Sequence, residues 1–173
     1  MTRLSQWEKQ RLKLYSNYEN LISDLHQEVE EALIHIKITD ITPTMLRAIK
    51  EVVYDAHHYE GKYGYERRYA SGGLGDPDNI KMAFSPTKSN REVEVLIRNR
   101  TQGNRNYKGS VYDWDESYTF EIDRIIVEGV GYSWTNSRFY QQTIPRDFYE
   151  ATKKEVEGYL HEKLLNYLKQ QGW

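Results

Sequence analysis

The chain has 173 residues and contains 24 lysines and arginines against 26 aspartates and glutamates, a formal net charge of −2 with histidine neutral. This balance excludes a globally basic nucleic-acid-binding protein. The chain has no cysteine, which excludes a disulfide framework, a thiolate metal site and a cysteine nucleophile. A chain of this length can bury a core without such support, so we expect a single α+β domain over residues 1–173.

Aromatic side chains are abundant in this chain. They account for 13% of the residues and include 15 tyrosines and 4 tryptophans, which either fill the core or serve interfaces where one end of the ring stays wet. No apolar run approaches the roughly 20 residues that cross a bilayer, and the first residues lack the apolar stretch of a signal peptide. We therefore expect no membrane contact and synthesis in the cytoplasm.

Apolar residues recur at steps of three and four between residues 4 and 38, which predicts a long amphipathic helix. They are Leu14, Tyr18, Leu21, Leu25, Val29, Ala32, Leu33 and Ile36. Neither glycine nor proline interrupts the pattern, and at ~1.5 Å per residue the helix would be longer than a compact core requires. We therefore expect either a break near Ser16 and Asn17 or a projecting helical arm over residues 1–16, with Trp7 as its only large anchor.

A second helix is predicted to begin after a short turn at residues 39–43, because Thr42 can cap it and Pro43 suits the first helical position. This helix is expected to end near His57. The predicted buried face comprises Met45, Ile49, Val52, Val53 and Ala56. Two helices joined in this way predict an αα-hairpin, or a long helix followed by one that crosses it.

The middle of the chain lacks a helical period. Residues 59–79 are rich in glycine, tyrosine and arginine and are expected to form a loop or an extended segment. Residues 80–84 and 92–98 alternate apolar and polar side chains around a turn-forming segment, which predicts a β-hairpin. Residues 99–117 are polar and rich in glycine and asparagine, so we expect a long surface loop there.

The last third of the chain predicts two helices. Residues 119–128 fit neither period cleanly, and we favour a short helix ended by Gly129 over a strand. A clear helical pattern follows Pro145 and continues to about Gln170. Its predicted face comprises Phe148, Thr152, Val156, Tyr159, Leu160, Leu164, Tyr167 and Leu168.

The glycines at residues 72–75 invite comparison with a phosphate-binding loop. Such a loop needs a strand before it and a helix directly after it, whereas here Asp76, Pro77 and Asp78 follow and place carboxylates where an anion would sit. Glycines that allow a tight chain reversal are the favoured interpretation. We expect no cofactor at this segment.

No set of residues predicts an enzyme. Asp78, Glu92 and Glu94 resemble the outline of a metal-dependent nuclease, but the lysine two places after the glutamate is missing. His57 and His58 are adjacent, so on a helix they point about 100° apart and cannot both face one metal ion. We therefore expect no catalytic residues and no metal site.

Charge is uneven along the chain. Basic residues lie beside the glycines at Arg67 and Arg68 and again between residues 98 and 108, and an acidic block follows at residues 113–123. Opposed blocks suit self-association, in which the loop of one subunit meets the acidic edge of the next. A solvated surface without a partner and a local nucleic-acid contact stay open as alternatives.

Three further patterns carry a family resemblance. They are Tyr65-x-Arg67-Arg68 with Gly72-Gly73-Leu74 and Asp78-Asn79-Ile80, then Ile126-Val127-Glu128-Gly129-x-Gly131-Tyr132, and then Ile144-Pro145-Arg146-Asp147-Phe148. Their order and spacing resemble the tail-component family of tailed bacteriophages, whose members join heads to tails or complete tails. The sequence departs from that family at residues 72–75, where the family usually has Thr-Gly-x-Leu-Arg.

This resemblance implies a small, mainly antiparallel sheet with a long N-terminal helix and a C-terminal helix packed on it. It also implies a virion protein of a phage or prophage, made in the bacterial cytoplasm, that forms a sixfold or twelvefold ring in the head–tail connector (neck) or tail-completion complex. The implied neighbours are neck, portal-adaptor, tail-terminator or tail-tube proteins, with DNA close to the lumen. Candidate interface residues are Trp7, Arg67, Arg68, Gly72, Gly73, Leu74, Arg98, Arg100, Arg105, Tyr107, Lys108 and Trp114.

The alternative is a small phage-encoded binding module that contacts nucleic acid or a host protein through the basic loop at residues 98–108. A steep fall of affinity with salt would indicate nucleic-acid binding.

Overall fold

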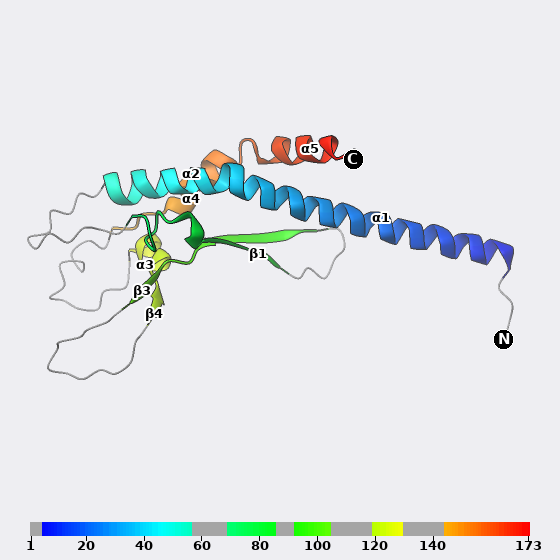
Figure 1. The fold of residues 1–173 in the computed structure, drawn as a ribbon, viewed down its shortest axis with the longest axis horizontal. Helices are drawn as coiled ribbons and strands as arrows, with labels where there is room; N and C mark the ends of the chain where they lie inside the picture. Colours follow the sequence, from blue (N-terminus) through cyan, green and yellow to red (C-terminus); the bar gives the residue numbers. More distant parts are fainter. Residues whose placement is uncertain (1–4, 57–68, 86–91, 105–118, 130–143) are drawn as a thin grey trace, which may run out of the picture.

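The computed structural model describes residues 5–56, 69–85, 92–104, 119–129 and 144–173. It confirms the α+β class, with a long N-terminal helix, an antiparallel hairpin and C-terminal helices (Figure 1). The N-terminal elements are α1 (Gln6–Ile36), η1 (Lys37–Ile41), α2 (Thr42–Ile49) and η2 (Lys50–Asp55). The remaining elements are η3 (Pro77–Asn79), β1 (Ile80–Ser85), β2 (Glu94–Asn99), β3 (Gln102–Asn104), β4 (Thr119–Glu121), α3 (Ile122–Glu128), α4 (Phe148–Val156) and α5 (Leu160–Gln170).

The first four elements form one continuous helical rod, so the predicted αα-hairpin with a turn at residues 39–43 is wrong. Right-handed helical dihedral angles continue through Ile41 and Thr42, and η1 is a π-helical turn in which the Thr42 N–H donates to the carbonyl of Lys37. The ring of Pro43 would clash with the preceding turn of a regular α-helix, and the wider π turn directly before it relieves that crowding. The proline is therefore accommodated without ending the helix.

The rod also runs without a break through Ser16 and Asn17, and its N-terminal part projects beyond the other described elements (Figure 1). It begins at a capping box. The Ser5 hydroxyl accepts a hydrogen bond from the Glu8 N–H (3.2 Å), and the Glu8 carboxylate accepts one from the Ser5 N–H (2.7 Å). These two bonds satisfy donors that a helix start leaves unpaired.

The main core lies between α2, α4 and the start of β1. It comprises Met45, Ala48, Ile49, Val53, Leu74, Ile80 and Phe148. The predicted inner face of the second helix is confirmed at Met45, Ile49 and Val53, but Val52 is only half-buried and Ala56 is exposed. A second cluster of Ile36, Ile41 and Val156 packs against the first turn of α5.

The predicted hairpin is confirmed. Strands β1 and β2 pair antiparallel from Ile80 opposite Asn99 to Ser85 opposite Glu94. Part of the predicted loop at residues 99–117 forms a strand instead, because β3 pairs with β4 from Gln102 opposite Glu121 to Asn104 opposite Thr119. The short helix α3 follows β4 directly and ends, as predicted, at Gly129 in a left-handed conformation (φ 65°).

The predicted C-terminal helix starts at Phe148 but is interrupted at residues 157–159, which separates α4 from α5. Gly158 has a low helix propensity, and Tyr159 leaves the helical region with φ −129° and ψ −9°. The interruption lets α4 pack on α2 while α5 lies along α1 (Figure 1). An ion pair between Arg47 and Glu155 joins α2 to α4, and an ion pair between Lys163 and Asp40 joins η1 to α5.

The left-handed cap at Gly129 gives a first prediction. A side chain at this conformation costs about 1 kcal/mol, so Gly129→Ala is expected to lower the free energy of unfolding by about that amount in urea denaturation. Gly158→Ala is the control. Its backbone is not left-handed and its new methyl group would meet only the Glu155 carbonyl at 3.9 Å, so its stability should be unchanged or slightly higher. Equal losses for both variants would contradict this account of Gly129.

The contact between Lys163 and Asp40 gives a pH prediction. The Lys163 ammonium donates a 2.8 Å hydrogen bond to the Asp40 carboxylate, and this bond, with a smaller contribution from the Thr39 hydroxyl, lowers the pKa of Asp40 from 3.8. Stability from a lowered carboxyl pKa is present above the ordinary value and is lost as the pH falls through the lowered one. Lys163→Met should therefore reduce stability at pH 7, and the deficit should shrink below pH 3.8.

The control for this pH prediction is Lys50→Met, which removes an exposed lysine elsewhere on the rod. Urea denaturation of the two variants and the parent at several pH values makes the comparison. A Lys163→Met deficit that stays constant down to pH 2 would show that the ion pair does not carry it.

Candidate functional site

The segment from Ser71 to Asn79 is a tight chain reversal closed by a carboxylate. Gly72 has a φ of 85°, and its N–H donates a 2.6 Å hydrogen bond to the Asp76 carboxylate, which also accepts one from the Asp78 N–H (2.9 Å). These two bonds, that from Gly72 first, lower the pKa of Asp76. A side chain of the same chain thus occupies the place that a phosphate takes in a phosphate-binding loop, which supports the chain-reversal interpretation.

The same reversal is fixed to the end of β2. The Asn99 side-chain amide donates to the carbonyl of Leu74 (2.7 Å), and the Thr101 hydroxyl donates to that of Gly73 (3.0 Å). Asn99 and Thr101 are fully buried, and Leu74 is a core residue with 4% of its surface exposed. Of the predicted interface residues here, Gly72 is at the surface, whereas Gly73 and Leu74 are buried within the chain.

A second set of polar side chains meets at the other face of the β2 end. Asp123 is fully buried at the start of α3, where its Oδ2 accepts hydrogen bonds from Arg98 (3.1 Å) and from the Tyr149 hydroxyl (2.7 Å). The Tyr149 hydroxyl in turn accepts one from the Asn99 N–H (2.8 Å). Burial first, and then the bond to Asp123, raise the pKa of Tyr149 far above its ordinary value, while Asp123 raises that of Arg98.

We call Arg98, Asn99, Asp123 and Tyr149 the β2-end network. It joins β2 to α3 and α4, and Glu121 extends it to the surface by pairing with both Arg98 (2.9 Å) and Arg100. The basic and acidic blocks seen in the sequence therefore meet, but for these residues they meet within one chain. Arg98 and Arg100 thus have acidic partners within the chain, and their contact with a neighbouring subunit stays a prediction.

No pattern in the sequence indicates that Asn99, Asp123 and Tyr149 are partners. In the sequence, Asp123 is one residue of an acidic run. Tyr149 follows the core residue Phe148, and nothing in the pattern around it indicates a polar contact. Their roles depend on contacts between residues 25 to 50 positions apart. Spacing along the chain cannot show such contacts.

The described residues do not bring together a metal-binding group. Within residues 5–56, 69–85, 92–104, 119–129 and 144–173, no three histidine or carboxylate side chains are placed to share a metal ion. Asp78, Glu92 and Glu94 are each exposed. Of the remaining candidates, Arg67, Arg68, Arg105, Tyr107, Lys108, Trp114, His57 and His58 lie outside the described residues, as does the side chain of Trp7.

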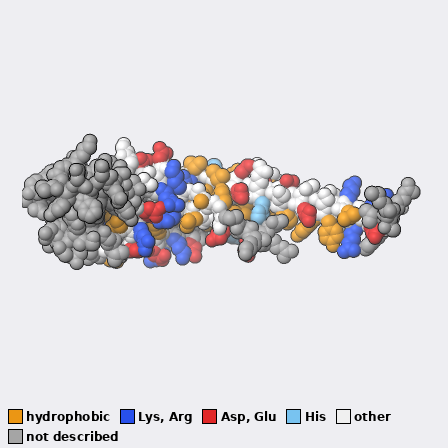
Figure 2. Space-filling view, turned by 90° about the horizontal axis from the view of Figure 1, so that it is seen from below, with side chains coloured by type: hydrophobic (Ala, Val, Ile, Leu, Met, Phe, Trp, Pro, Cys, Tyr) orange, Lys and Arg blue, Asp and Glu red, His pale blue; other side chains and the backbone are white. Residues whose placement is uncertain are grey.

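The strongest surface feature is the N-terminal part of α1. We call residues 6–21 the arm; its described side chains are all exposed, including the large apolar ones (Figure 2). These are Leu12, Leu14, Tyr15, Tyr18 and Leu21, with 51% to 70% of their surface accessible. Contiguous exposed apolar surface of this kind marks an interaction site, so the arm is the candidate functional site.

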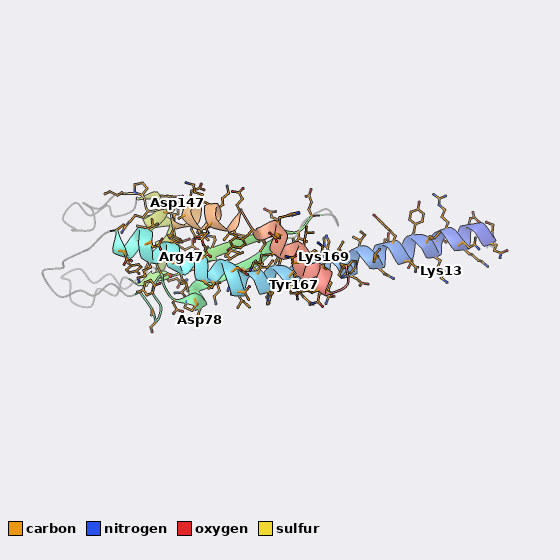
Figure 3. All side chains as sticks on the ribbon, turned by 90° about the horizontal axis from the view of Figure 1, so that it is seen from above. Lys13, Arg47, Asp78, Asp147, Tyr167 and Lys169 are labelled. Atoms are coloured by element: carbon orange, nitrogen blue, oxygen red, sulfur yellow. The ribbon has the colours of Figure 1, made fainter. Side chains whose placement is uncertain are left out.

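The arm also carries cations, and it extends past the other described elements. Lys13 points away from the helix well beyond the end of α5, where Tyr167 and Lys169 lie (Figure 3). No helix in the described part of the chain is both long enough and apolar enough to cross a membrane.

The fold and the arm define a small α+β protein with an unpartnered helical surface. The family model YomN matches residues 17–171, so the chain belongs to the YomN family, a phage-derived family named after a Bacillus prophage gene. The chain is therefore a phage-related protein. This confirms the phage origin that the sequence resemblance implied. No curated protein and no solved structure matches the chain.

The β2-end network predicts unequal effects for two neighbouring arginines. Arg98→Met removes the cation from the buried Asp123, and leaving a buried carboxylate uncompensated costs about 3 kcal/mol of unfolding free energy. Arg100→Met removes only an exposed ion pair with Glu121 and should cost less than about 1 kcal/mol. Urea denaturation of both variants makes the comparison. Similar losses for the two would show that Asp123 does not depend on Arg98.

Proposed function

We propose that this chain is a non-enzymatic structural protein of the phage or prophage particle, a ring-forming subunit of the head–tail connector (neck) or the tail-completion complex. The observation that carries the proposal is the arm. Its apolar side chains have no cover within the described residues, which is the expected state of a subunit seen without its neighbours.

The physics of isolated helices supports an intermolecular role for the arm. A helix of this length is marginal in water, because most helical stability in proteins comes from packing of an apolar face. The arm spans residues 6–21 and carries Leu14, Tyr18 and Leu21 exposed. A neighbouring subunit or particle protein would bury them.

The body of the protein supports the same proposal in a different way. The β2-end network and the reversal at residues 71–79 hydrogen-bond several buried polar groups within the chain, and Oδ2 of the Asp123 carboxylate accepts from Arg98 and Tyr149. That arrangement suits a rigid scaffold. The proposed neighbours are neck, portal-adaptor, tail-terminator or tail-tube proteins, with DNA near the ring lumen and no membrane.

The ion pairs of the chain argue against the alternative, a binding module that uses a basic loop at residues 98–108. Arg98 and Arg100 both pair with Glu121, and Arg98 also pairs with Asp123. Two of the cations that would contact a phosphate backbone are therefore neutralised inside the chain.

The test is genetic and structural. Disrupting the gene in its phage or induced prophage should leave heads and tails unattached in electron micrographs and reduce infectious titre, and a plasmid copy should restore both. Mass spectrometry of purified particles should detect the chain, and light scattering of the protein mixed with its tail-tube neighbour should give a sixfold or twelvefold ring. Normal attached particles that lack the protein would overturn the proposal.

A further inference from the structure

The face of α1 that includes the arm carries a seam with coiled-coil spacing. Its residues follow at alternating steps of three and four: Arg11, Leu14, Tyr18, Leu21, Leu25 and Glu28. Such steps keep side chains on one face of a helix, where they can interdigitate with a partner helix. A cation stands at one end of this seam and an anion at the other, with four apolar residues between them.

The seam is most accessible toward its N-terminal end. Leu14, Tyr18 and Leu21 have 70%, 54% and 51% of their surface exposed, whereas Leu25 and Glu28 are half-buried where the body of the protein begins. Arg11 is also exposed, with its guanidinium 5.5 Å from the centre of the Tyr15 ring. Arg11, Leu14, Tyr18 and Leu21 are therefore open to a second helix, which would meet Leu25 and Glu28 at the edge of the body.

The order of residues in the seam is symmetric about its middle. The midpoint falls between Tyr18 and Leu21, and Arg11 and Glu28 lie at equal distances from it. A second copy laid antiparallel would place Arg11 opposite the partner's Glu28. The same register places Leu14 opposite the partner's Leu25, and Tyr18 opposite the partner's Leu21.

Charge selects this orientation. A parallel pair would set each Arg11 against another Arg11 and each Glu28 against another Glu28, which is unfavourable. The flanking charges agree, because Lys9, Arg11 and Lys13 make the start of α1 basic, whereas Glu19, Asp24, Glu28, Glu30 and Glu31 make the following turns acidic. An antiparallel pair brings the basic part of each helix to the acidic part of the other.

We propose that the free protein dimerises through antiparallel pairing of α1 with a second copy of the chain, over residues 11–28. The overlap is about 27 Å long at ~1.5 Å per residue, which is a modest interface and predicts a concentration-dependent dimer. This inference rests on the arm being an intermolecular surface, as in the proposed function, but not on a place in the particle. A two-fold pair is not a ring contact, so it describes the protein before assembly.

Cysteine cross-linking tests the orientation directly, because the chain has no native cysteine. Leu14→Cys and Leu25→Cys variants are expected to form a disulfide-linked dimer when mixed and oxidised, and neither should form one alone. Cross-linking of Leu14→Cys with itself would indicate a parallel pair and overturn the proposal. Absence of any cross-link from a protein that remains monomeric at all concentrations would also overturn it and leave another phage protein as the occupant of the arm.

A charge exchange provides a second measurement that does not alter the apolar seam. Arg11→Glu alone and Glu28→Arg alone should each raise the dimer dissociation constant about tenfold at low salt, and the double variant should restore it. Lys50→Glu is the control, since it makes the same charge change at an exposed position of the rod outside residues 11–28 and should have little effect. Sedimentation equilibrium measures all four variants.

In this second test, a double variant whose dimer dissociation constant is as high as that of the single variants would overturn the pairing of Arg11 with Glu28. The particle experiments above are independent of this result, so failure of the dimer and failure of the ring subunit can be told apart.

Discussion

The buried carboxylate of Asp123 is the constraint on which the body of this protein depends. A charge taken out of water is costly unless it is paired and hydrogen-bonded, and here Arg98 from β2 and Tyr149 from α4 supply those bonds. Because the three side chains come from three elements, the position of each element is tied to that of the other two. The Tyr149 hydroxyl also accepts from the Asn99 N–H, so the register of β2 is included in the same network.

Asn99 connects the β2-end network to the glycine reversal at residues 71–79. Its backbone contacts Tyr149, and its side chain holds the carbonyl of Leu74, which places Leu74 in the core beside Ile80. A short hairpin with one packed face is only marginally stable alone. The hydrogen bonds at the end of β2 therefore compensate for the small sheet and join it to α4 through Tyr149.

Local patterns in the sequence were sufficient for the elements whose structure depends on near neighbours. The alternation at residues 92–98 predicts β2, and Gly129 predicts the end of α3, because strand period and left-handed caps are local properties. The turn predicted at residues 39–43 is wrong because a proline usually starts or ends a helix. The π turn that accommodates Pro43 cannot be recognised from the sequence. For the candidate site, the apolar pattern of the arm is evident in the sequence, but the sequence leaves open whether the helix breaks near Ser16 and Asn17 or projects, and the structure has the unbroken helix.

The unbroken rod explains why the arm can be exposed at all. An αα-hairpin with its turn at residues 39–43 would fold the first helix back on the second. The π turns η1 and η2 instead keep α1 and α2 on one continuous helix, with α2 fixed in the core by Met45 and Ile49. A partner that binds the arm is thereby held at a fixed orientation to the body, because a straight helix transmits position without a hinge. The continuous helix through Pro43 thus sets the direction in which the interaction surface points.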